Sequence, residues 1–126
     1  PGAAERRDTG FRDLEATAAS ARAHTYARLG RRADAERALV VAIPLTANPT
    51  GLSDLHHAQF AIGCAYALLG QRDEAVRWLV KAAEEGYPSY PKFGGHADVQ
   101  SLKGHPAYDA LLDRLRRDWE RWTATL

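Results

Sequence analysis

A stretch of this sequence recurs forty residues further along the chain. The run Thr25–Glu36 (TYARLGRRADAE) aligns with Ala65–Val76 (AYALLGQRDEAV). In this alignment identical residues pair with one another: Tyr26 with Tyr66, Leu29 with Leu69, Gly30 with Gly70, Ala35 with Ala75, Leu39 with Leu79, and Ala42 with Ala82. An internal repeat predicts stacked units that bury a shared core. Such arrays usually bind partners and seldom catalyse reactions.

The first repeat predicts a helical hairpin over about residues 9–43. Gly30 is expected to end its first helix, and Pro44 its second. Residues 1–8 lack apolar periodicity and are expected to form a linker or a disordered end. Residues 44–51 are rich in helix breakers and predict a loop. The small and apolar residues of the first helix recur at helical spacing: Phe11, Leu14, Ala18, Ala21, Thr25 and Leu29.

The second repeat predicts a second hairpin over about residues 53–86, with Ser53 as N-cap and Gly70 and Gly86 as stops. Residues 87–104 predict a connection with one short helical turn around 98–102. A capping helix is expected over about residues 106–123, with an apolar stripe: Tyr108, Leu111, Leu112, Leu115, Trp119 and Trp122. No segment alternates with period two. The sequence therefore predicts one all-α domain over 9–126, an antiparallel helix-hairpin stack with a C-terminal capping helix.

The second unit resembles the tetratricopeptide repeat family. The motif residues at matching spacings are Ile62, Gly63, Tyr66, Leu69, Gly70, Ala75, Leu79 and Ala82. Gly63 and Ala75 are expected to let the two helices approach closely, and Gly70 to turn the chain through a positive φ. Gln59 stands where the family usually has Trp, and Arg22-Ala23 replaces Leu-Gly in the first unit.

The C-terminal part resembles the end of tetratricopeptide arrays attached to bacterial transcriptional activators, nucleotide cyclases and Ser/Thr kinases. This similarity covers Leu68–Glu85, His96–Tyr108 and Leu111-Leu112, although His96-Ala97-Asp98-Val99 replaces the usual Asp-Pro-Asp-Leu. The resemblance implies a tetratricopeptide-like α-solenoid that serves as a protein- or peptide-binding scaffold in a larger, regulatory bacterial protein. Its peptide-binding concave face is expected to contain Thr17, Ser20, His24, Arg28, His57, Phe60, Cys64 and Leu68.

Several alternatives stay open from the sequence. The concave face is either free for a partner protein or a neighbouring domain of the same polypeptide, or filled by the chain's own terminal segment or a second copy. Trp119 and Trp122 either pack back as part of the cap or form a homodimer contact. The chain is alternatively a homo-oligomerisation element, or a small-molecule sensor with a pocket between the hairpins and residues 87–93 as its lid.

Composition and motifs narrow the function classes. With 17 basic and 16 acidic residues the net charge is +1, so no nucleic-acid partner is expected. No apolar run is long enough for a membrane segment or signal, and Cys64 is the only cysteine, which favours the cytoplasm. His24, His57 and Cys64 match no zinc-site spacing, so no metal or cofactor is expected. Catalytic motifs are absent, and the chain is predicted not to be an enzyme.

Overall fold

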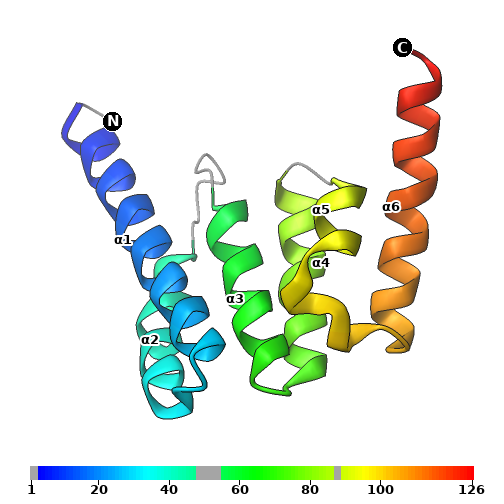
Figure 1. Ribbon diagram of the computed structural model, residues 1–126. Helices are drawn as coiled ribbons and strands as arrows, with labels where there is room; N and C mark the ends of the chain where they lie inside the picture. Colours follow the sequence, from blue (N-terminus) through cyan, green and yellow to red (C-terminus); the bar gives the residue numbers. More distant parts are fainter. Residues whose placement is uncertain (1–2, 48–54, 87–88) are drawn as a thin grey trace.

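The computed structural model describes the backbone of residues 3–47, 55–86 and 89–126, and side chains within these ranges from residue 10 onward. All regular structure in these ranges is helical, which confirms the predicted all-α class. The elements are α1 (Ala3–Arg28), α2 (Arg32–Leu45), α3 (His56–Leu68), α4 (Arg72–Glu85), α5 (Tyr90–Gly95), the 3₁₀ helix η1 (Ala97–Leu102) and α6 (Pro106–Ala124) (Figure 1).

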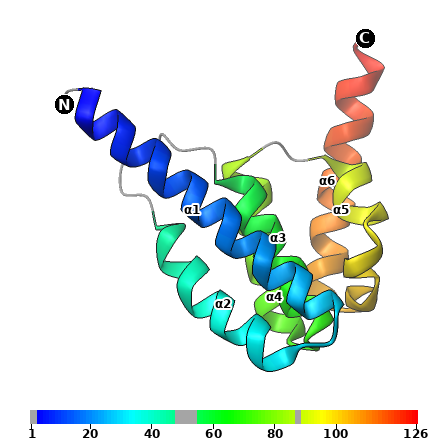
Figure 2. The ribbon, with the colours of Figure 1, turned by 60° about the vertical axis from the view of Figure 1, so that its left-hand side comes forward.

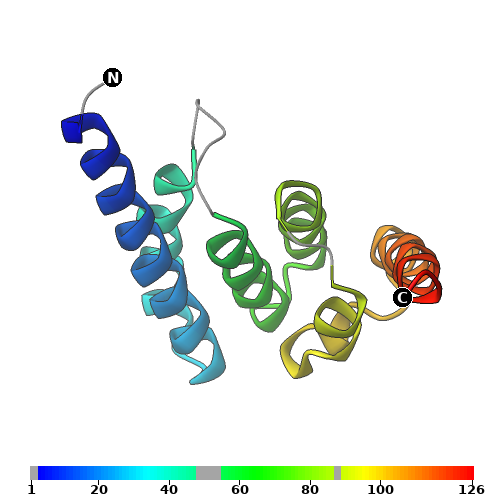
Figure 3. The same ribbon diagram turned by 90° about the horizontal axis from the view of Figure 1, so that it is seen from above.

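The helices form two antiparallel hairpins followed by a C-terminal segment. α1 packs on α2, α3 packs on α4, and the two hairpins meet mainly through α1 and α3 (Figure 1). η1 lies against α3, while α5 and α4 both contact α6. Seen from above, the hairpins and α6 follow one another in a row from α1 to α6 (Figure 3). The two helices of each hairpin, α1 with α2 and α3 with α4, therefore lie side by side.

The turns inside the two hairpins have nearly the same geometry. Gly30 and Gly70 adopt φ values of 73° and 80°, the positive φ that glycine tolerates best. The hydrogen bonds around these glycines repeat: Gly30 N to Ala27 O and Gly70 N to Ala67 O are both 3.1 Å, and Arg31 N to Tyr26 O and Gln71 N to Tyr66 O are both 2.9 Å. The sequence repeat is thus also a repeat of helix-turn-helix geometry.

Two other glycines are required by close packing. A Cβ at Gly63 would lie 2.8 Å from Leu79 Cδ2 and 3.3 Å from the Ala75 carbonyl oxygen, which agrees with the predicted close approach of α3 and α4. Gly86 follows the last residue of α4, as expected, but its φ is −125°. A Cβ there would lie 2.2 Å from the Cβ of His56. Space, and not backbone conformation, selects glycine at position 86.

Several helix boundaries differ from the sequence prediction. α1 begins at Ala3, so most of the expected linker 1–8 is helical. α2 includes Pro44 and ends one residue later; because Pro44 has no N–H, it cannot donate to the Val40 carbonyl, and only Leu45 follows it in the helix. α3 begins at His56, and the predicted N-cap Ser53 lies outside the described residues. α5 was missed, because a six-residue helix is too short to show periodicity.

The buried face of α1 is not the face with the larger apolar residues. The side chains that it buries are small: Ala16, Ala19, Ser20, Ala23 and Ala27. By contrast, Phe11, Leu14 and Leu29 are 66%, 70% and 65% exposed. Small side chains allow α2 and α3 to approach α1 closely, so the alanine row packs inward. The apolar spacing predicted the helix correctly, but it did not identify the core side of that helix.

Candidate protein-binding face

The structure divides the eight predicted binding residues between open and covered positions. In α1, Thr17 and Arg28 are exposed and His24 is partly buried. Ser20 is 1% exposed, and its Oγ donates to the Ala16 carbonyl at 2.7 Å. The four residues of α3 divide in the same way, with two exposed and two buried: His57 and Leu68, and Phe60 and Cys64, respectively. The eight side chains therefore do not form one open surface.

A segment of the chain itself covers this face at α3. Phe93 of α5 packs edge-on against Phe60, with ring centroids 5.0 Å apart. The His96 ring contacts Phe60 at 5.5 Å, and Lys92 Nζ lies 4.6 Å from the centre of the Phe60 ring. Phe93 is only 2% exposed. The part of this face around Phe60 is therefore covered by the internal segment α5–η1, and not by the terminal segment or second copy that the sequence left open.

An acidic residue of η1 links this segment to α1. Asp98 Oδ2 accepts hydrogen bonds from His24 Nε2 at 2.6 Å and from Arg28 Nε at 2.7 Å. The Asp98 side chain is 12% exposed, whereas Arg28 remains 56% exposed. Burial alone would raise the pKa of the Asp98 carboxyl, but the hydrogen bonds from His24 and Arg28 outweigh it and hold this pKa below its usual 3.8.

The sequence predicts both partners of Asp98 as site residues but not Asp98 itself. His24 and Arg28 are predicted on the binding face, whereas Asp98 belongs only to the similarity with a family ending and to the helical turn expected around 98–102. One feature of the sequence could have suggested Asp98. It is an acidic residue in the connecting segment 87–104, and the predicted binding face contains the basic residues His24 and Arg28. His24 and Asp98 are 74 residues apart in the sequence, so local spacing does not reveal the pair.

Acid is expected to loosen α5–η1 in two stages. Burial lowers the pKa of His96 below its usual 6.5, and that of Asp98 is below 3.8. Each folded-state pKa is depressed, so each group's stability contribution is complete above its usual pKa and is lost as the pH falls through the folded value. The midpoint of thermal unfolding should fall below pH 6.5 and fall further below pH 3.8. Replacing Asp98 by Asn should flatten the second decline, and identical curves for both proteins would contradict this assignment.

Cys64 lies beneath the same segment, in surroundings that disfavour its thiolate form. It is completely buried, and burial raises its pKa to about 12, so the thiol stays protonated at neutral pH. Cys64 occupies the repeat position of His24, but only His24 bonds to Asp98. Among the described residues, no group of three or more His, Cys, Asp and Glu side chains is placed to hold a metal ion. Because the Cys64 thiol is buried, its rate of reaction with a thiol reagent can report whether α5–η1 stays closed.

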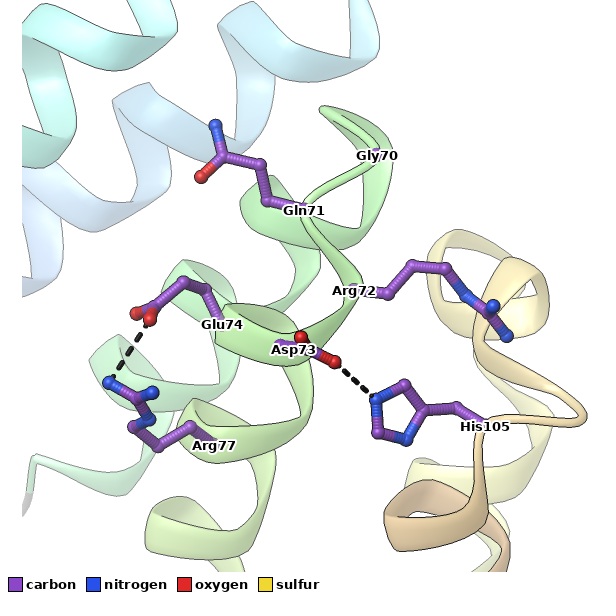
Figure 4. Close-up of a pocket in the computed structure, with 7 residues that line it drawn as sticks. All are labelled: Gly70, Gln71, Arg72, Asp73, Glu74, Arg77 and His105. Carbon is purple, nitrogen blue, oxygen red and sulfur yellow. Dashed lines mark hydrogen bonds and ion pairs between the residues drawn. The ribbon is translucent and has the colours of Figure 1, made fainter.

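An open cavity of about 600 Å³ lies where α4 begins (Figure 4). Its charged side chains pair with one another: His105 Nε2 donates to Asp73 Oδ1 at 2.7 Å, and Arg77 lies 3.0 Å from Glu74. Arg72 donates to the Lys103 carbonyl at 3.3 Å. These contacts tie α4 to the start of α6. Because acidic and basic groups neutralise each other here, the cavity gives no selectivity for a charged ligand.

A more apolar groove of about 380 Å³ separates the hairpins. It is lined by Glu36, Leu39, Val40, Ile43, Pro44, Tyr66 and Gln71. Val40 is 74% exposed, so the groove is shallow and open to solvent. The lid expected over residues 87–93 does not cover it in its described part, because Phe93 packs on Phe60. Tyr87 lies outside the described residues.

The C-terminal helix caps the second hairpin with only part of its stripe. Tyr108, Leu111 and Leu115 are buried, and Tyr108 Oη donates to the Phe93 carbonyl at 2.9 Å. The last turns of α6 extend past the other helices (Figure 1), and there Trp122 is 52% exposed, with its ring 5.8 Å from that of Trp119. The first half of α6 is thus held against the other helices, whereas Trp122 does not pack back as part of a cap.

Comparison with protein-family models, with curated proteins and with solved structures finds no match to this chain. Among the described residues, no helix has the length and apolarity needed to cross a membrane. A function must therefore be inferred from the residues and their geometry.

Proposed function

We propose that this chain is a tetratricopeptide-like helical-hairpin module that binds a protein or peptide segment and has no catalytic role. The equal turns at Gly30 and Gly70 support a stack of like units. The sequence resemblance adds the expectation of a bacterial, cytoplasmic regulatory protein of which this module is a part. Helix pairs of this kind offer an extended surface to partners.

The observation that carries the proposal is the occupied face of α1 and α3. This face already holds a short segment by two features, an aromatic ring against Phe60 and a carboxylate between His24 and Arg28. In the bound segment these features come from Phe93 and Asp98, five positions apart. A partner segment with an aromatic residue followed five positions later by an acid has the chemistry to replace α5–η1.

The bound segment also contributes to the core, and this determines how exchange must occur. Val99 and Leu102 are completely buried in the cluster that contains Leu79 and Tyr108. A partner therefore binds only when η1 opens, and its apparent affinity is reduced by the small fraction of open molecules. Weakening the Asp98 anchor is expected to raise that fraction.

A peptide of residues 89–104 tests the proposal. Its binding, followed by fluorescence anisotropy, should be at least about tenfold tighter for an Asp98→Ala chain than for the wild type, because a lost charged hydrogen bond is worth roughly 1.5–3 kcal/mol. Adding Arg28→Ala to that chain should weaken binding again, since the acid of the peptide loses its donor. A peptide in which Asp98 is replaced by Ala should bind weakly to every chain.

The reactivity of Cys64 provides a second measurement of whether α5–η1 has opened. Its reaction with a thiol reagent should be faster in the Asp98→Ala chain, and added peptide should slow it again by covering the opened face. An Asp113→Ala chain, which removes a half-buried acid of α6 paired with Arg116, should react like the wild type. If the opened chain binds no peptide while its Cys64 reacts quickly, α5–η1 is a structural part of the core and this face is not a recognition surface.

Two other functions each rest on one observation. The exposed Trp122 favours homo-oligomerisation, which light scattering across protein concentrations would detect. The apolar groove beside Val40 and Tyr66 favours a small-molecule sensor. A ligand of that groove would raise the midpoint of thermal unfolding, because it binds only the folded chain.

A further inference from the structure

One side of α1 carries an apolar row that no described part of the chain covers. The row runs along the helix at positions three and four residues apart: Phe11, Leu14, Ala18, Ala21, Thr25 and Leu29. All six side chains are exposed, and three of them are large. Figure 2 shows α1 along the front of the molecule, with no helix in front of it.

The equivalent positions in the second repeat unit show how part of this row packs when a helix covers it. The repeat positions equivalent to Ala18, Thr25 and Leu29 are Ala58, Ala65 and Leu69 in and just after α3. In the second unit all three are buried, at 1%, 0% and 7% exposure, in the clusters shared with the first hairpin. These three positions of the second unit are thus helix-packing positions, and no helix of the described residues covers the equivalent positions of α1.

The first and last helices of the stack, α1 and α6, differ in the chemistry of their exposed side chains. At the α6 end the exposed side chains include Arg114, Arg117 and Arg121, a charged outer face of the kind that closes a helical stack. At the α1 end the exposed row is apolar. These charged side chains make the outer face of α6 a poor partner for the apolar row, which favours pairing of α1 with α1 over head-to-tail stacking of copies.

We propose that α1 is the interface of a homodimer in which the α1 helices of two copies pack antiparallel about a twofold axis. Ala18 and Ala21 then face Ala21 and Ala18 of the partner subunit, and these small side chains permit close approach. Leu14 packs against Thr25 of the partner subunit. In this register Glu15 lies beside Arg22 of the partner subunit, and the symmetry forms that pair twice.

Charge complementarity is what favours a second copy over another partner. Glu15 and Arg22 are both exposed, and they flank the row on the same edge seven positions apart, two helical turns. Two residues at that spacing are too far apart to pair within one helix. Across an antiparallel pair each meets its opposite charge. The proposal concerns a surface separate from the Phe60 face and does not depend on the proposed function.

A charge exchange tests this arrangement in the full chain. Sedimentation equilibrium should show a concentration-dependent dimer. Replacing Glu15 by Arg, or Arg22 by Glu, should raise the dissociation constant at least about tenfold, because each places like charges together twice. The double variant Glu15→Arg/Arg22→Glu should restore the wild-type value to within about threefold. Thermal unfolding at dilute concentration should be the same for all, because both residues are exposed.

Other outcomes would overturn the proposal. A chain that is monomeric at all concentrations has no such dimer, and then the row of α1 serves a different protein. If both single variants and the double variant raise the dissociation constant of the dimer equally, the antiparallel register is excluded. A dimer that persists in Glu15→Arg but dissociates in Trp122→Asp would place the interface on α6.

Discussion

Replacing Phe93 by alanine should lower the free energy of unfolding by about 3–5 kcal/mol. The ring is 2% exposed, packs edge-on against Phe60 at 5.0 Å, and belongs to the cluster that contains Val99, Leu102 and Tyr108. Its removal costs the transfer free energy of the ring and leaves a cavity that the surrounding helices fill only in part. Because whole domains are stable by only roughly 5–15 kcal/mol, this single change should unfold a large fraction of molecules at moderate denaturant concentrations.

Phe11 offers a matched control, because the same substitution there removes a ring that is 66% exposed. Phe11→Ala should change the free energy of unfolding by no more than about 0.5 kcal/mol. Chemical denaturation should be measured at a concentration at which the chain is monomeric, so that self-association does not contribute. Equal effects at the two positions would mean that α5 is not held against α3 as described.

A valine at Gly63 is expected to be the second most damaging change, at about 1–3 kcal/mol. The first added carbon would already lie 2.8 Å from Leu79 Cδ2 and 3.3 Å from the Ala75 carbonyl oxygen. The side chain of Leu79 can turn aside only within a packed core, and the carbonyl belongs to the backbone of α4. Valine adds two further methyl groups, so the helices of the second hairpin must separate.

Gly10 is the control for that change, since it also lies within a helix but a Cβ there would meet nothing within 4 Å. Gly10→Val should leave stability unchanged or raise it by a few tenths of a kcal/mol, because valine has the higher helix propensity. The two variants therefore differ only in their surroundings. A similar free energy of unfolding for both would show that α3 and α4 do not approach each other closely at Gly63.

The occupied face changes what the proposed binding function requires. A free groove binds a partner directly, whereas this face must first release α5–η1. The anchor at Asp98 is mostly buried, and its partners His24 and Arg28 both come from the first hairpin. The segment therefore joins the two hairpins, and its release would loosen the contact between them as well as expose Phe60 and Cys64. Partner binding and the arrangement of the hairpins are coupled in this proposal.

The parts of the fold that local chemistry fixes were predictable. The sequence predicts that Gly30 and Gly70 stop helices and that Gly70 adopts a positive φ; in the structure both glycines follow a helix and both have a positive φ. The end of α4 before Gly86 and the start of α6 at Pro106 also agree with prediction, because apolar spacing and helix-ending residues are local signals. The beginning of α1 was less accessible, since residues 3–8 have no apolar stripe that marks a helix.

The sequence by itself determined that this chain is helical and that its two central units repeat, because periodicity and turn chemistry depend on neighbouring residues. Only the tertiary structure decided which side of α1 is buried and what lies on Phe60. Both depend on contacts between residues far apart in the chain, such as His24 with Asp98. A row of alanines lets neighbouring helices approach more closely than a row with phenylalanine and leucine. The spacing of apolar residues does not reveal this difference, and because of it the larger side chains of α1 remain exposed to solvent.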